Sequence, residues 1–147
     1  MEKTVRAAEA ADFERLESFL AEAQQGISLK EGSADYYSLL ETHSGQLRAC
    51  VGIEPSEGAG LIRSLVVQKG TSHEDVLLLL GRVLRIAKEK NLFRIFLVTD
   101  KQSASLFLQE LGFRETTYEE ANSFIGDLEH FKWVSNVDNS IIMKISI

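Results

Sequence analysis

Hydrophobic residues recur along the chain at two spacings, and each spacing predicts one type of element. A repeat of three or four residues, typical of a helix with one buried face, runs through residues 12–23 and 74–90, and a shorter helix over 101–111 ends at Gly112. A further helical stretch is expected around residues 119–130. Alternating or continuous apolar runs predict strands over residues 4–7, 36–42, 47–54, 61–67, 92–98, 113–117 and 139–147.

The order of these elements predicts an α/β domain with a mixed sheet. Turns that contain glycine, over residues 43–46 and 55–60, connect three consecutive strands into an antiparallel meander. The next helix joins the strands 61–67 and 92–98 through a right-handed crossover, which makes these two strands parallel. We therefore expect a mostly antiparallel sheet with one parallel pair and helices on both faces. Because the chain has one proline and no repeat or low-complexity tract, residues 1–147 are expected to form a single domain.

The charge of the chain argues against two classes of partner. Its 147 residues carry a formal charge of −6, with a pI near 5.1 and no run of Lys and Arg, so neither nucleic acid nor a membrane surface is an expected partner. The longest aliphatic run, residues 76–80, is also far shorter than the roughly 20 residues that a membrane span requires.

The few cysteine and histidine residues limit the chemistry further. Cys50 is the only cysteine and lies in an apolar stretch, so no internal disulfide can form and a reducing cytoplasm is the expected location. We expect Cys50 to be a small buried hydrophobic residue and not a reactive thiol. The three histidines, His43, His73 and His130, are widely spaced, and no metal site is expected. Trp133 is expected to be a core or dimer-contact aromatic, and a homodimer is one possible assembly.

Three segments in the second half of the chain carry a resemblance to a known family. They read LIRSLVV over residues 61–67, LFRIFLVTD over 92–100 and ASLFLQELGF over 104–113, and a loop and a long helix separate the first two. This arrangement resembles the core of the GNAT acetyltransferases, and the similarity spans nearly the whole chain. Within that superfamily the strand 61–67 and the segment around residues 129–143 are most similar to small N-acetyltransferases of arsenic-resistance operons.

The resemblance implies a fold, a cofactor and a reaction. The fold would be that of the GNAT acyltransferases, acetyl-CoA would be the donor, and a small-molecule amine would be the acceptor. The strand 61–67 would splay from the next parallel strand, and the pantetheine arm of the cofactor would pair with the backbone of Leu65, Val66 and Val67. The diphosphate would lie at the N-terminus of the helix beginning near Glu74, where exposed amides and the helix dipole attract anions.

The phosphate loop of this chain departs from the glycine-rich pattern of the family. Counted without gaps from Val67, the first position of the pattern falls on Ser72, the next on His73, and the two glycine positions on Asp75 and Leu77. If cofactor binding is retained, its segment would be Ser72, His73, Glu74, Asp75, Val76 and Leu77. Two carboxylates here would each repel a phosphate charge by roughly 3 kcal/mol at about 5 Å and an effective dielectric of about 20.

Two interpretations of this loop remain open. Ser72 followed by Asp75 is a capping-box pattern, so the helix could carry its own anions in place of the cofactor phosphates. Alternatively, the loop still binds coenzyme A through backbone amides. The first interpretation favours a non-catalytic binding or dimerisation module, and the second favours an N-acetyltransferase with weakened cofactor binding.

Candidates for catalysis are few. Glu54, at the end of the third strand, is the candidate general base, and its alternative is a strand-end acid that pairs with Arg63. Arg63 and Ser64 are candidates for substrate contact, because a guanidinium on an interior strand requires a partner or an anionic ligand. In many relatives a tyrosine serves as the general acid, and the matching position here is Leu108.

Overall fold

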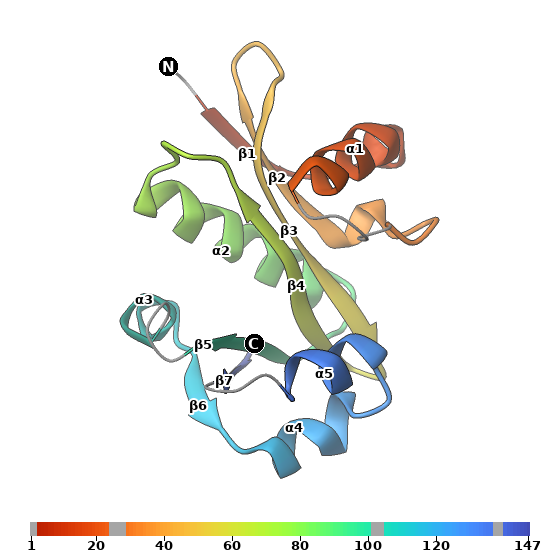
Figure 1. Ribbon diagram of the computed structural model, residues 1–147, viewed down its shortest axis with the longest axis vertical. Helices are drawn as coiled ribbons and strands as arrows, with labels where there is room; N and C mark the ends of the chain where they lie inside the picture. The colour runs from red at the N-terminus through yellow and green to blue at the C-terminus, as the bar shows by residue number, and fades with distance from the viewer. Residues whose placement is uncertain (1–2, 24–28, 101–104, 137–139) are drawn as a thin grey trace. The chain divides into compact units, whose positions relative to one another are not determined.

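The computed structural model describes residues 3–23, 29–100, 105–136 and 140–147, which form one mixed sheet and its covering helices (Figure 1). Seven strands within these residues have the order β1-β2-β3-β4-β5-β7-β6. They are β1 (Lys3–Ala7), β2 (Tyr37–Thr42), β3 (Leu47–Ser56), β4 (Ala59–Val67), β5 (Arg94–Asp100), β6 (Arg114–Thr116) and β7 (Ser140–Ser146). The helices are η1 (Ala10–Asp12), α1 (Phe13–Ala23), η2 (Ala34–Tyr36), α2 (His73–Glu89), α3 (Ser105–Glu110), α4 (Tyr118–Ile125) and α5 (Glu129–Val134).

The fold class predicted from the sequence is confirmed. β4 and β5 pair in parallel, whereas β1 with β2, β2 with β3, β5 with β7 and β6 with β7 pair antiparallel. No helix among the described residues has both the length and the apolar character that crossing a membrane requires. The start of the predicted helix 101–111 and residue 139 of the last predicted strand lie outside the described residues.

One predicted turn and one predicted helix differ from the structure by more than the shift of a few residues seen at several strand ends. The turn expected over residues 55–60 contains only Glu57 and Gly58, whose φ angles of 36° and 81° are both positive, as in a two-residue hairpin turn that matches the twist of its strands. The helix expected around 119–130 is two helices, because α4 ends at Ile125 and the backbone of Leu128 is extended before α5 begins. Apolar spacing alone does not detect such a break.

Contacts divide the chain into two compact units. The first unit comprises Met1–Ile53 and Arg63–Ile86, and the second comprises Glu54–Ile62 and Ala87–Ile147. Each unit is therefore assembled from two separate stretches of the chain.

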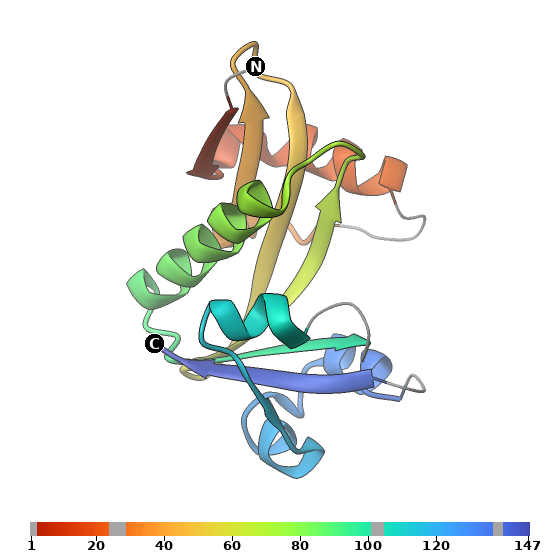
Figure 2. The ribbon, with the colours of Figure 1, turned by 90° about the vertical axis from the view of Figure 1, so that its left-hand side faces the viewer.

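In the first unit α1 and α2 lie on opposite faces of the strands (Figures 1 and 2). The apolar stripe of α1, formed by Leu16, Phe19 and Leu20, packs with Leu39 and Cys50 in one core. On the part of α2 that belongs to this unit, the buried positions are Leu79, Leu80, Val83 and Ile86. The hydroxyl of the buried Ser38 on β2 donates to the Leu79 carbonyl at 3.0 Å, which joins the helix to the sheet.

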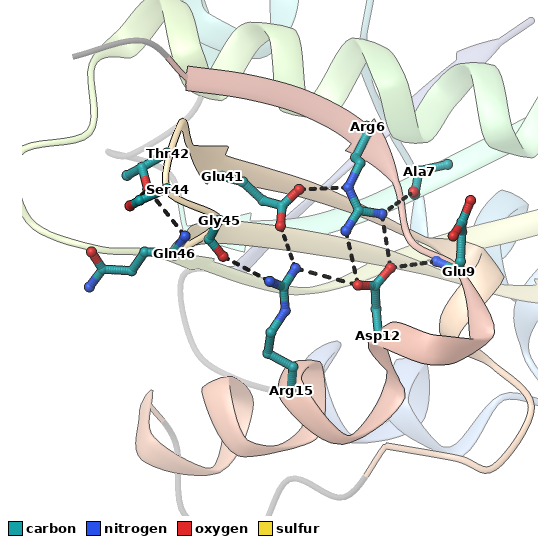
Figure 3. A network of polar contacts seen from close by, with 10 residues as sticks. All are labelled: Arg6, Ala7, Glu9, Asp12, Arg15, Glu41, Thr42, Ser44, Gly45 and Gln46. Carbon is teal, nitrogen blue, oxygen red and sulfur yellow. Dashed lines mark hydrogen bonds and ion pairs between the residues drawn. The ribbon is translucent and has the colours of Figure 1, made fainter.

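Four charged side chains, Arg6, Asp12, Arg15 and Glu41, connect β1, η1, α1 and β2 (Figure 3). We call them the charge cluster. The Arg6 guanidinium donates to both Asp12 oxygens at 2.9 Å and to Glu41 at 2.6 Å, while Arg15 donates to Glu41 and to Asp12. Bidentate pairing of this kind is among the stronger charge-assisted contacts. The hydrogen bond from Arg6 is the main reason that the pKa of Asp12 falls to about 2.

In the second unit α4 and α5 pack on β4 and β5. Phe96, Ala121, Ile125 and Phe131 are fully buried in this core, and they pack with Leu61 at the start of β4. Figure 2 shows α3 and α4 on opposite sides of β5 and β7.

Trp133 on α5 is 76% exposed, so the interpretation as a core aromatic is wrong. Trp133 lies on the exposed side of α5, whereas Phe131, two residues earlier, is buried. The dimer contact remains a prediction.

Candidate functional site

The candidate site lies in the first unit, along the C-terminal half of β4, the following loop and the N-terminus of α2. β4 departs from regular strand geometry at Ser64, whose φ of 58° lies in the left-handed region. A residue other than glycine in this region costs about 1–2 kcal/mol. The parallel pairing with β5 covers Ala59–Leu61, which precede this point. The strand continues to Val67, but its regular geometry is interrupted at Ser64, one of the two residues predicted to contact substrate.

Two of the three residues after Ser64 expose apolar side chains to solvent. Leu65 is 40% and Val67 is 39% exposed, whereas Val66 between them packs against the α1 core. This alternation is that of a strand, so Leu65 and Val67 share a face. These three residues are the ones predicted to pair with a pantetheine arm.

Cys50 on β3 lies beside the interruption. Its side chain is fully buried, which confirms the prediction of a small buried hydrophobic residue. Its sulfur donates to the carbonyl oxygen of Ser64 at 3.6 Å, and burial raises the pKa of the thiol to about 12. A hydrogen bond from the Val66 backbone N–H acts in the opposite direction on this pKa.

The loop between β4 and α2 is held by β3 and by its own hydrogen bonds. Gln68 N donates to the Arg48 carbonyl at 2.9 Å, and the Arg48 guanidinium donates to the Lys69 carbonyl at 3.1 Å. The hydroxyl of Thr71 donates to the Gln68 carbonyl at 2.8 Å. Gly70 has a φ of 92°, which is why glycine suits this position of the turn.

Ser72 caps α2, as the sequence predicted. Its hydroxyl oxygen accepts a hydrogen bond from Asp75 N at 3.1 Å, which satisfies one of the amides at the helix start. The Asp75 carboxylate lies 2.9 Å from Lys3 Nζ of β1, and the two side chains are 20% and 23% exposed. The Lys3 hydrogen bond is the largest cause of the lowered pKa of Asp75, and hydrogen bonds from the Ser72 side chain and backbone lower it further. Asp75 is therefore a paired anion within a capping box.

The remaining residues of the predicted phosphate segment differ in exposure. His73 and Glu74 are exposed, and Val76 and Leu77 are half-buried. Because Leu77 is only partly exposed, its bulk is only partly available to obstruct a ligand at the helix terminus.

The other predicted site residues belong to both compact units. Arg63 and Ser64 are both half-buried in β4 of the first unit. Glu54, the candidate base, is half-buried in β3 and belongs to the second unit. Leu108, at the position of the family's tyrosine, is buried in α3 and offers no proton. In the described part of the chain, no three His, Cys, Asp and Glu side chains gather as a metal site would require.

Lys3 and Cys50 are site residues that sequence reasoning missed in these roles. Lys3 lies 72 positions before Asp75, and no local pattern signals a pair at that separation. Cys50 carries an apolar signal only, and the contact with Ser64 depends on the interrupted geometry of β4.

The fold is that of the GNAT acetyltransferases. Rv2747 from Mycobacterium tuberculosis, crystallised in complex with CoA, has a TM-score of 0.67 and 21% identity over 98% of this chain and 99% of its own. The ribosomal-protein-S18-alanine N-acetyltransferase of Escherichia coli has a TM-score of 0.64 and 15% identity over 99% of this chain and 94% of its own. No protein-family model and no curated protein matches the sequence.

A third similar structure belongs to a much longer protein. The N-acetylglutamate synthase of Neisseria gonorrhoeae, complexed with coenzyme A and N-acetyl-glutamate, has a TM-score of 0.69 and 23% identity over 99% of this chain. The chain spans about a third of that protein, 35% of its length.

Proposed function

We propose that this chain is a coenzyme A-dependent N-acyltransferase that carries an acetyl group from acetyl-CoA to a small-molecule amine, with weakened affinity for the cofactor. The observation that supports it most is the interruption of β4 at Ser64, followed by the exposed Leu65 and Val67 and by the N-terminus of α2. Solved structures with the same fold hold coenzyme A.

In this proposal each part of the site has one task. The backbone of Leu65, Val66 and Val67 binds the pantetheine arm, and the loop with the first turn of α2 receives the diphosphate. The bound cofactor supplies an acetyl thioester. Glu54 is the proposed base for the amine, and Arg63 with Ser64 is proposed to contact the acceptor. Since Leu108 replaces the family's tyrosine, the departing thiolate takes its proton from water or from another residue.

The loss of affinity comes mainly from Glu74. The Asp75 carboxylate is paired with Lys3, so its charge is largely balanced within the protein. Glu74 is exposed at the same helix start, where an anionic ligand would meet it. With solvent screening, one such carboxylate about 5 Å from a phosphate costs roughly 1–3 kcal/mol, which is about 5-fold to 150-fold in affinity.

A second candidate is a GNAT-fold binding or dimerisation module without catalytic activity. The capping of α2 by Ser72 and Asp75 favours it, because these two side chains occupy hydrogen-bonding groups that a diphosphate would otherwise use. The exposed Trp133 is a suitable contact for a second copy of the chain.

If the chain is an active enzyme, the sequence of β4 favours a place among the small N-acetyltransferases of arsenic-resistance operons.

Calorimetric titration with coenzyme A and acetyl-CoA tests the proposal. We expect binding in the micromolar to millimolar range by the wild type and at least fivefold tighter binding by Glu74→Lys. Glu14→Lys is the matched control, because Glu14 is exposed on α1 of the same unit and gives the same change of net charge. Its affinity is expected to change by less than twofold.

Two outcomes would contradict the proposal. The absence of both heat and a thermal shift at millimolar ligand, in the wild type and in Glu74→Lys, would leave the binding-module alternative. Binding without release of free coenzyme A thiol, when acetyl-CoA is mixed with a panel of small primary amines, would remove the transferase activity. Cys50 is buried and would not react with the thiol reagent in such an assay.

A further inference from the structure

The backbone on both sides of Leu65 meets the same sulfur atom. The carbonyl oxygen of Ser64 accepts from Cys50 Sγ at 3.6 Å, and the backbone N–H of Val66 faces the sulfur and lowers the pKa of the thiol. The Cys50 thiol thus donates to the peptide group before Leu65 and lies against the N–H of the one after it. A thiol can do both, because its S–H is a weak donor and its sulfur a weak acceptor.

These contacts lie in a buried core, where water cannot replace them. Cys50 is fully buried in the α1 core beside Leu39, and Val66 packs against the same core. A backbone group left without a partner in such a place destabilises the conformation that buries it. Ser64 is itself in the left-handed region with a φ of 58°, a conformation that persists only when neighbouring contacts enforce it.

We infer that Cys50 is a positioning residue, whose thiol holds the interrupted backbone of β4 around Leu65 in one conformation. The proposed pantetheine-binding residues begin at Leu65, so the thiol sets the backbone to which the cofactor would pair. This second step rests on the proposed function, whereas the first concerns the ligand-free protein alone. No ionisation or reaction of the sulfur is required.

Three variants separate hydrogen bonding from packing. Cys50→Ser keeps a donor and an acceptor, Cys50→Val fills the space with neither, and Cys50→Ala removes both the bonds and the volume. Leu39→Val is the matched control, because Leu39 lies opposite Cys50 in the strand register and in the same core. It removes a methylene without touching the bonds to β4.

The readout in the ligand-free protein is amide hydrogen exchange by NMR. We expect the exchange rate of the Val66 amide, divided by that of the Leu40 amide on β2, to rise at least tenfold in Cys50→Val and Cys50→Ala. The ratio should stay within threefold of the wild type in Cys50→Ser and in Leu39→Val. An unchanged ratio in Cys50→Val would overturn the inference, even if Cys50→Ala did not fold.

The second readout is the dissociation constant of coenzyme A. We expect it to rise about tenfold in Cys50→Val and less than threefold in Cys50→Ser. A loosened Val66 amide with unchanged affinity would refute the link to the cofactor. If the wild type binds no coenzyme A, the proposed function fails, and the exchange ratio still decides whether the thiol positions β4.

Discussion

At the scale of single residues, the charge cluster shows how this acidic chain buries ions. Arg6 and Arg15 balance Asp12 and Glu41, so the four side chains sum to zero although the whole chain carries −6. The Asp12 carboxylate also accepts from Glu9 N at 2.8 Å and so closes the capping box of η1. Each oxygen of Asp12 thus has a donor, as a buried carboxylate requires.

This pairing predicts an acid-dependent stability. The pKa of Asp12 is about 2 in the folded protein and about 3.9 in an unfolded chain, so the folded state gains stability above pH 4 and loses it as the pH falls toward 2. Because Arg6 is 33% exposed and solvent screens the pair, we expect a contribution of roughly 1–2 kcal/mol. Urea unfolding between pH 6 and pH 2.5 measures it.

At pH 6 the Asp12→Asn variant should unfold at a lower urea concentration than the wild type does. On acidification it should lose less stability than the wild type does. Glu14→Gln serves as the control, because Glu14 is an exposed acid of α1. Its free energy of unfolding should fall with pH as that of the wild type does. An equally steep acid loss in Asp12→Asn would show that other carboxylates determine it.

At the scale of elements, the pairing of β2 with β3 depends on a missing side chain. Tyr37 lies opposite Gly52 in the register, and its ring covers the glycine so closely that a Cβ there would lie 2.4 Å from Cζ. The buried Tyr37 ring takes the place that a side chain on β3 would otherwise fill. A larger residue at Gly52 would therefore force the Tyr37 ring to move.

Gly52→Ala is therefore expected to lower the free energy of unfolding by about 1–3 kcal/mol through overpacking against a buried ring. Gly81→Ala is the contrasting variant, since Gly81 lies on α2 with nothing within 4 Å of an added Cβ. It should raise stability by about 0.5–1 kcal/mol, because alanine is the better helix residue. Equal effects of the two variants in urea unfolding would contradict the packing argument.

Sequence reasoning was most successful with elements that carry a long apolar period. The helix expected over residues 74–90 is observed as α2 (His73–Glu89), and the crossover rule correctly made β4 and β5 parallel. The cap by Ser72 was also predictable, because it needs only residues three positions apart. All of these signals are local.

The geometry of the candidate site could not be predicted in the same way. The left-handed conformation of Ser64 carries no sequence signal, because serine has no preference for it and a contact from Cys50 on another strand helps to enforce it. The pairing of Asp75 with Lys3 joins residues 72 positions apart and depends on the completed sheet. Counting charges at the phosphate loop therefore leaves out the cation that pairs with Asp75.

At the scale of the whole molecule, the excess of acidic residues acts on any anionic ligand. Coenzyme A carries several phosphate charges, and the chain has 22 acidic against 16 basic residues. Salt screens repulsion between exposed charges beyond about 8–10 Å at physiological ionic strength. A site that attracts phosphates loses affinity as the salt concentration rises. Here we expect the opposite, because salt screens the repulsion from the excess of acidic residues.

We accordingly expect the affinity for coenzyme A to rise about twofold to fivefold between 50 and 500 mM NaCl. Calorimetry at both salt concentrations measures this change, and Glu74→Lys should reduce or reverse it. Weaker binding of the wild type in high salt would mean that a local cationic site dominates.

The division of each unit into separate stretches affects the order in which the protein can form during synthesis. Ala59 and Leu61 enter the second unit early, but Phe96, Phe131 and Ile142, which complete their core, are made later. Until β7 has been synthesised, the start of β4 therefore lacks part of its apolar covering. The nascent chain must carry this exposed surface until residue 142 has been added, a state in which a chaperone would protect it from aggregation.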